Sequence, residues 1–429
     1  MDLFSILAAL LTLAALFSYL NYRYIHLPTT IGVMLIALVG SMAIVALHEV
    51  GIVDLEEPVR VLLSSIRFDQ AVLEGMLSAL LFAGALHINL NDLAEEKLTI
   101  GVLATVGVAL STVIVGSATF LIAGWLGFEL PFIYALLFGA LISPTDPIAV
   151  IGLLKTAGVP KSLETKIAGE SLFNDGVGVV VFLIILELAT GNEPVTVGHA
   201  AGLFVQEAGG GALFGLAAGY LAYRMLKQVD NYQVEVLITL ALVTGGYALA
   251  MRWHLSAPIA VVVSGLLIGN QGRAFAMSDT TRVHLDTFWE LIDEILNAVL
   301  FLLIGLEVLV ITLDVSIFTM ALLAIPIALF ARTAAVVIPL TLLRPFEGRN
   351  EKGAIPVLVW AGLRGGISVA LVLSLPPGEI RELLLGATYA VVIWTIVVQG
   401  LTVPWLVRRV IPEGSLTADR GRKTADGGS

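Results

Sequence analysis

The stretch "LISPTDPIAV", Leu141 to Val150, interrupts an apolar segment that runs from 131 to 154. Within five residues it places two prolines, Pro144 and Pro147, and one acid, Asp146. Each proline removes an amide hydrogen that a carbonyl in the preceding turn needs, and it biases the residue before it toward an extended backbone. The stretch therefore predicts a helix that breaks, with free carbonyl groups and a carboxylate at the break.

The composition indicates a protein that crosses the bilayer many times. Of the 429 residues, 58% are hydrophobic and only 13% are charged. A soluble protein of this length needs more charge to cover its surface. The lack of cysteine excludes disulfides and thiolate metal sites. The net charge of -11 describes only the loops of such a protein, so we expect neither a cofactor nor a nucleic-acid partner.

The hydropathy pattern predicts an all-α fold of thirteen spans, each of about 20 residues. The ninth stretch is short and two others are long, so counts of twelve and fourteen stay open. The fifth span is broken by "SPTDP" at 143–147, and the twelfth by "GLRGGIS" at 362–368. The spans are 3–20, 28–48, 70–91, 98–126, 131–154, 163–190, 199–223, 233–252, 257–271, 288–312, 314–343, 353–375 and 382–407.

The distribution of basic residues predicts the orientation. Seventeen Lys and Arg, Lys155 among them, fall on one side of the thirteen spans. Four, Arg60, Arg67, Arg252 and Arg381, fall on the other, which predicts an external N-terminus and a cytoplasmic C-terminus. The two broken spans are seven apart, so the matching helices would cross in opposite directions, as in transporters built from inverted repeats. We expect one membrane domain at 1–410, with repeats at about 1–190 and 233–410 joined by a helix at about 199–223, and a short disordered cytoplasmic tail at 411–429.

The sixth span gathers polar side chains on one face. In "AGESLFNDGVGVVVF", Glu170, Ser171, Asn174 and Asp175 cover about 140° of the helix. Ionisable groups inside a membrane are candidates for function by default, and Asp175 is the deeper of the two acids. Glu170 lies nearer the cytoplasmic end, so simple solvation stays an alternative for it.

Oxygen ligands without water suit a hard cation such as Na⁺. Burial favours the protonated carboxylate, whereas a bound cation favours the ionised one. A site that holds either ion but never both couples their movements, so the pattern predicts exchange of a cation for a proton at Asp175. The alternative for the break itself is a proline kink that serves packing.

Two arginines lie within spans, where each needs a buried partner. Arg364 in the twelfth span is expected to pair with Glu170, and an interfacial position stays the alternative. Arg332 in the eleventh span has no clear partner, although Glu307 is possible. His87 near the end of the third span is expected to be an ordinary polar residue near the cytoplasm.

The motifs "SPTDP", "GESLFNDGVGVVVF", "LNAVLFLLIGLEV" and "GLRGGISVALVLSLP" resemble the monovalent cation/proton antiporter-1 family, over nearly the whole chain to about Val410. The resemblance implies thirteen helices in two inverted six-helix repeats and a homodimer. It also implies elevator-like alternating access and a place in a prokaryotic inner membrane. The implied reaction is electroneutral exchange of Na⁺, and also Li⁺, for H⁺.

The resemblance also implies roles for individual residues. Asp175 matches the family's ion- and proton-binding carboxylate, and Asp146 the second acid. The Thr145 carbonyl, the Ser171 hydroxyl and Asn174 would bind the ion together with the two acids, and Asn174 also marks one-for-one exchange. Glu170 and Arg364 match a stabilising ion pair. One position departs from the pattern, because many relatives carry a glutamate in the third span where this chain has Ala83.

Three alternatives stay open. Exchange of K⁺ for H⁺ uses the same scaffold with a different cavity size. An intramembrane aspartyl protease could use Asp146 and Asp175 as a dyad, although neither acid lies in a Gly-x-Gly-Asp setting. A channel would need polar residues along a whole pore, whereas here they cluster at one depth.

Overall fold

The structure is a computed structural model, which describes residues 3–49, 68–146, 148–191, 197–308, 315–347 and 353–411. Every regular element within these ranges is helical. Arg60 and Arg67, which entered the orientation argument, and the predicted tail beyond residue 411 lie outside the described residues.

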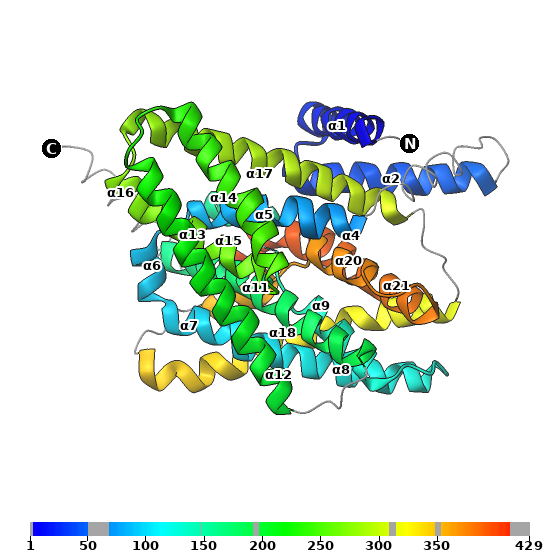
Figure 1. Cartoon of the computed structure of the whole chain (residues 1–429). Coiled ribbons are helices and arrows are strands. Elements are labelled where there is room, and N and C mark those ends of the chain that lie inside the picture. The colour runs from blue at the N-terminus through cyan, green and yellow to red at the C-terminus, as the bar shows by residue number, and fades with distance from the viewer. Residues whose placement is uncertain are drawn as a thin grey trace.

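The first half of the chain forms long helices, several of them joined end to end through a π-helical turn (Figure 1). Its helices are α1 (Leu3–Leu20), α2 (Thr29–Glu49), α4 (Phe68–Gln70), α5 (Leu77–Leu86), α6 (Leu90–Glu95), α7 (Lys97–Val102), α8 (Val108–Trp125), α9 (Phe132–Ile142), α10 (Ile148–Ala157) and α11 (Lys161–Thr190).

The second half of the chain is also built of helices, some of them joined end to end through a π-helical turn. Its helices are α12 (Val197–Phe204), α13 (Gly210–Leu226), α14 (Tyr232–Arg252), α15 (Ala257–Leu267), α16 (Arg273–Phe275), α17 (Asp279–Glu307), α18 (Val315–Glu347), α19 (Ala354–Trp360), α20 (Gly366–Leu373), α21 (Glu379–Trp394) and α22 (Leu401–Val410).

Each predicted span has a helical counterpart in the described ranges. Eight of the helices found there are long and apolar enough to cross a membrane, and the total of thirteen spans stays a prediction. The helix of the tenth predicted span, 288–312, extends beyond it on the N-terminal side, because α17 begins at Asp279. Its first turns are charged, so hydropathy does not detect them, and Ser278 caps them by accepting a hydrogen bond from the Thr281 amide at 3.3 Å.

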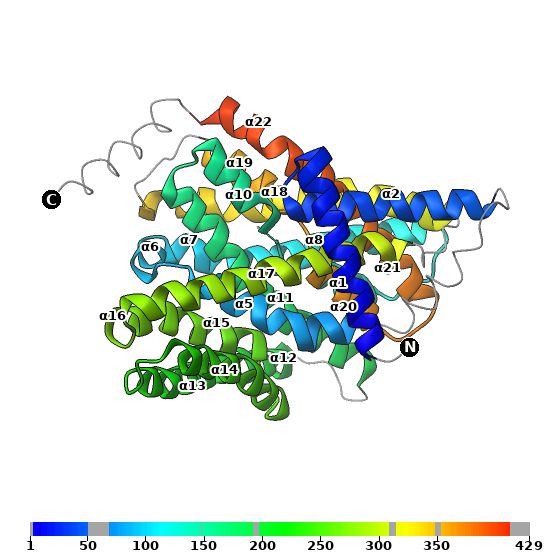
Figure 2. The same cartoon turned by 90° about the horizontal axis from the view of Figure 1, so that it is seen from above.

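The helices form two groups with α11 between them. Viewed from above in Figure 2, α13, α14 and α15 gather along one side, and α18, α19 and α22 lie on the other. Helix α11 contacts α15 in the first group and α19 in the second. Glycine permits the closest approach within the first group, because a Cβ on Gly215 would lie 2.2 Å from the Ala260 oxygen. The polar face of α11 is thereby held in the middle of the protein.

Candidate functional site

Two interrupted helices meet beside α11. Helix α9 ends at Ile142 and α10 begins at Ile148, whereas α19 ends at Trp360 and α20 begins at Gly366. The amide of Asp146 donates to the carbonyl of Leu363 at 2.8 Å, so the two irregular stretches hold each other by a main-chain hydrogen bond. Irregular backbone at membrane depth is tolerated only where protein or a water-filled cavity satisfies its polar groups.

Arg364 satisfies the free carbonyls of the first break. Its Nη1 donates to the carbonyl oxygens of Ser143 and Pro144, the latter at 2.7 Å, and its own amide donates to Thr395 Oγ1 at 3.1 Å. The side chain is fully inside the protein, with 2% of its surface exposed. The interfacial alternative for Arg364 is therefore wrong.

The expected pair between Glu170 and Arg364 is also corrected by the structure. Glu170 instead makes a two-pronged ion pair with Arg332, through Nη1 to Oε1 and through Nη2 to Oε2 at 3.0 Å. Arg332 Nη2 also donates to the Leu358 carbonyl at 2.8 Å. Arg332 thus has a partner that the sequence did not reveal, and Glu307 does not fill that role. Glu170 is 2% exposed, so simple solvation does not describe it.

Three of the predicted cation ligands bind one another. The Asn174 side chain accepts from the Thr145 amide at 3.2 Å and donates to the Thr145 hydroxyl at 2.9 Å. Ser171 Oγ donates to the Thr145 carbonyl. Because these contacts join α11 to the broken stretch, Asn174 and Ser171 hold that stretch in place. Ser143, which was expected to be extended before Pro144, instead has helical backbone angles of φ -73° and ψ -38°.

Two glycines let the broken stretch approach its neighbours. A Cβ on Gly178 would lie 2.3 Å from Pro144 Cγ, and a Cβ on Gly365 would lie 2.1 Å from Asp146 Oδ2. These are distances that real Cβ atoms do not show, so a larger residue at either position would displace the stretch. The "DGVG" and "RGG" segments of the two motifs therefore serve close packing at the crossing.

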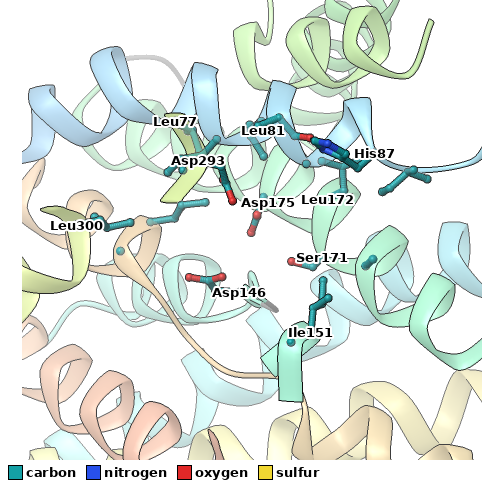
Figure 3. A pocket seen from close by; sticks show the side chains of 18 of the residues that line it. Leu77, Leu81, His87, Asp146, Ile151, Ser171, Leu172, Asp175, Asp293 and Leu300 are labelled. Carbon is teal, nitrogen blue, oxygen red and sulfur yellow. The ribbon is translucent and has the colours of Figure 1, made fainter. Parts of the chain in front are cut away.

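A cavity of about 390 Å³ lies against the crossing, and carboxylates point into it. Figure 3 shows Asp146, Asp175 and Asp293 directed toward one space, with the Ser171 hydroxyl at its side. Asp175 is 9% exposed. The opposite wall is apolar and comes partly from α5, including Leu81. The site is therefore a pocket with several acidic oxygens and one hydrophobic wall, large enough for a small cation with water.

The outer part of this cavity carries the more exposed ionisable groups. Lys155, on α10, pairs with Glu164 at 3.3 Å, and both line the cavity together with His87. His87 is exposed, and its Nδ1 lies 2.8 Å from the Ala83 carbonyl, which agrees with an ordinary polar residue at a helix end. The lysine is already paired, so it does not neutralise the inner acids.

Asp293 is the side chain at this cavity that sequence reasoning missed. It lies in the charged early part of α17, ahead of most of the predicted tenth span, among Glu290 and Glu294, where an acid looks like a solvated surface residue. Ala83, which stands where many relatives carry a glutamate, lines the same cavity. The signal that could have found Asp293 is its placement three residues after Glu290 and four before Asn297, on one face of a helix.

The comparisons with known proteins agree on one family. Residues 9–409 match the family model described as the transmembrane sodium/hydrogen exchanger, so the chain belongs to this family of multi-pass integral membrane transporters. The sodium/proton antiporter NhaP of Pseudomonas aeruginosa is 51% identical over 419 residues, covering 97% of this chain and 99% of that protein. The sodium/proton antiporter NhaH of Halobacillus dabanensis is 36% identical, covering 89% and 92% respectively.

A solved structure supports the fold. The sodium proton antiporter MjNhaP1 from Methanocaldococcus jannaschii matches with a TM-score of 0.74 at 17% identity, over 96% of this chain and 100% of that chain. At this identity the likeness concerns the fold. Membership of a transporter family removes the intramembrane aspartyl protease alternative.

Proposed function

We propose that this protein exchanges Na⁺, and also Li⁺, for H⁺ across the membrane by alternating access, with both ions competing for Asp175. One observation carries the proposal: Asp146 and Asp175 line one cavity beside the crossing of two interrupted helices. The two arginines nearby are occupied elsewhere, Arg332 by Glu170 and Arg364 by backbone carbonyls. The cavity therefore offers the carboxylate oxygens of both acids to a cation or a proton.

The geometry supports distinct roles for the remaining residues. Asp146 would be the second acid of the site, and Ser171 already faces the cavity. Its hydroxyl and the Thr145 carbonyl would reach the ion once their mutual hydrogen bond opens. Asn174 brings no charge beside Asp175, so binding of one Na⁺ or one H⁺ there changes the charge of the site equally. This supports electroneutral exchange.

The choice of Na⁺ over K⁺ rests on the relatives. Those of Pseudomonas aeruginosa and Halobacillus dabanensis are named as sodium/proton antiporters, and they match nearly the whole chain.

We extend the proposal to a homodimer in the lipid bilayer of a prokaryotic inner membrane, with the N-terminus outside and the C-terminus in the cytoplasm. The domain plan remains two inverted repeats, 1–190 and 233–410. Lys155, one of the residues predicted to face the cytoplasm, lines the cavity, which supports a cavity that opens to that side.

The test is Na⁺-driven proton movement in proteoliposomes. Purified protein is reconstituted, an inside-acid gradient is set, and proton efflux is followed on adding Na⁺, Li⁺ or K⁺, with and without a membrane-potential clamp. We expect efflux with Na⁺ and Li⁺ that ignores the clamp, and an apparent KM for Na⁺ that rises as the pH falls, because protons compete.

The matched variants are Asp175→Asn and Glu187→Gln. Both remove one carboxylate from α11, but Glu187 is exposed. Exchange should disappear in the first variant and persist in the second. Full exchange by Asp175→Asn would refute the role of this carboxylate, and efflux driven by K⁺ but not Na⁺ would move the proposal to K⁺/H⁺ exchange.

A further inference from the structure

A second polar cavity adjoins the first at Asp293. It measures about 410 Å³ and lies among the start of α2, α10 and α17. Thr29, Thr30 and Thr156 line it together with Asp293 and Asn297. Asp293 and Gly152 line both cavities, so the two spaces meet there. Glycine at 152 leaves the junction open, because a Cβ there would meet nothing within 4 Å.

Asp293 has no neutralising partner in the described part of the chain. The ion pairs found there involve other acids: Lys155 holds Glu164, and Arg332 holds Glu170. The Oδ1 atom of Asp293 is buried and lacks a hydrogen-bond partner. In Figure 3 its carboxylate points toward the space that Asp175 and Asp146 share. A half-buried carboxylate without a partner is costly unless it serves a ligand.

Asn297 provides an independent observation at the same junction. It lies one turn after Asp293, is 2% exposed, and borders the second cavity. Its Nδ2 and Oδ1 make no hydrogen bond of normal geometry, although the Asp293 carboxylate lies close enough to interact with this side chain. Buried amides are almost always hydrogen-bonded, so this side chain indicates a ligand or an ordered water at the junction.

We propose that Asp293 and Asn297 form a cation-binding position at the junction of the two cavities, from which a partly hydrated monovalent cation passes to Asp175. Carboxylate and amide oxygens are the donors a hard cation takes. No cluster of three His, Cys, Asp or Glu ligands occurs among the described residues, so water would complete the coordination shell. On this view α17 supplies an acid to a cavity where α5 supplies only apolar residues, Ala83 among them.

The position rests on the proposed function, so two measurements keep the proposals separate. The first is equilibrium binding of radioactive Na⁺ to detergent-purified protein, which requires no exchange. The second is the Na⁺ dependence of exchange in proteoliposomes. Asp293→Asn is compared with Asp279→Asn, which changes an exposed acid on the same helix that lines neither cavity, and with the charge-preserving Asp293→Glu.

The expected result is a split between KM and maximal rate. Asp293→Asn should weaken Na⁺ binding and raise the KM about tenfold, as loss of one nearby charge implies, while the maximal rate changes less than about twofold. Asp293→Glu should restore most of the affinity, and Asp279→Asn should leave the affinity of the wild type unchanged. Unaltered Na⁺ binding and KM in Asp293→Asn would overturn the proposal even where Asp175→Asn abolishes exchange. If wild-type protein shows no exchange, the proposed function fails, and the binding assay still decides whether Asp293 holds Na⁺.

The variant Asn297→Leu tests whether Asn297 binds the cation or only supports the fold. Because the amide makes no hydrogen bond of normal geometry within the described residues, an apolar side chain of similar size should not lower the melting temperature. A raised KM at unchanged stability is the expected outcome. Unchanged KM together with lost stability would show that Asn297 supports the fold and would remove it from the site.

Discussion

Experiment can distinguish the ion pair between Glu170 and Arg332 from the pair between Glu170 and Arg364 that the sequence suggested. Both side chains are buried, at 2% and 7% exposure. The guanidinium contacts both carboxylate oxygens and also donates to the Leu358 carbonyl. Arg364, by contrast, donates to main-chain carbonyls of the broken stretch. A double-mutant cycle therefore gives different answers for the two arginines.

The magnitude follows from what each variant leaves behind. Arg332→Met leaves a buried carboxylate without its partner, which costs about 3–5 kcal/mol. Glu170→Met leaves an unpaired guanidinium and should cost a similar amount. The double variant leaves only the Leu358 carbonyl unsatisfied, about 1–3 kcal/mol. The double variant should thus lose less stability than the two single losses added together, with a coupling free energy of at least about 2 kcal/mol.

The assay is reversible unfolding in mixed micelles with increasing denaturant, followed by circular dichroism and by a second probe that tests two-state behaviour. The same cycle with Arg364→Met should give a coupling to Glu170 below about 1 kcal/mol, because their side chains share no hydrogen bond. A coupling to Arg364 that equals or exceeds the coupling to Arg332 would refute the assignment of partners.

Two further substitutions test how the crossing is held. Asn174→Ala removes both side-chain hydrogen bonds to Thr145 and leaves the buried amide of Thr145 without a partner. We expect the free energy of unfolding to fall by about 1–3 kcal/mol in the same assay, together with slower exchange. Unchanged stability would show that these two hydrogen bonds are dispensable. Gly365→Ala places a methyl group against Asp146 and should abolish Na⁺-driven proton efflux. The control is Gly40→Ala on α2, where a Cβ meets nothing within 4 Å, and it should leave the efflux intact. Full activity of Gly365→Ala would mean that the crossing of the two interrupted helices tolerates displacement.

The sequence predicted the parts of the fold that depend on local chemistry. Proline at 144 and glycine at 365 and 366 mark the interruptions because their effect on the backbone needs no tertiary context. Hydropathy located the helices because a bilayer-sized apolar run is a strong signal. It placed the start of α17 too late because the charged turns after Asp279 are stabilised by a cap and by packing rather than by hydrophobicity.

The partners of charged side chains were not predictable in the same way. Nothing in the sequence separation distinguishes Arg332 from Arg364 as the partner of Glu170, since either helix could pass beside α11. The choice depends on where each guanidinium ends after the helices pack. Asp293 escaped notice for a related reason: its neighbours Glu290 and Glu294 make the local sequence look like a solvated face. Of the three, only Asp293 is partly buried in the folded protein, whereas Glu290 and Glu294 are exposed.

The break in the fifth span explains why this site needs two arginines. Interrupting the helix frees the carbonyls of Ser143 and Pro144, and a buried donor must satisfy them; Arg364 does so with its guanidinium. That arginine is then unavailable to Glu170, whose carboxylate would be costly alone, so a second guanidinium, that of Arg332, is required. Both guanidinium groups are bound in this way, Arg364 by main-chain carbonyls and Arg332 by Glu170, beside the cavity that Asp146 and Asp175 line.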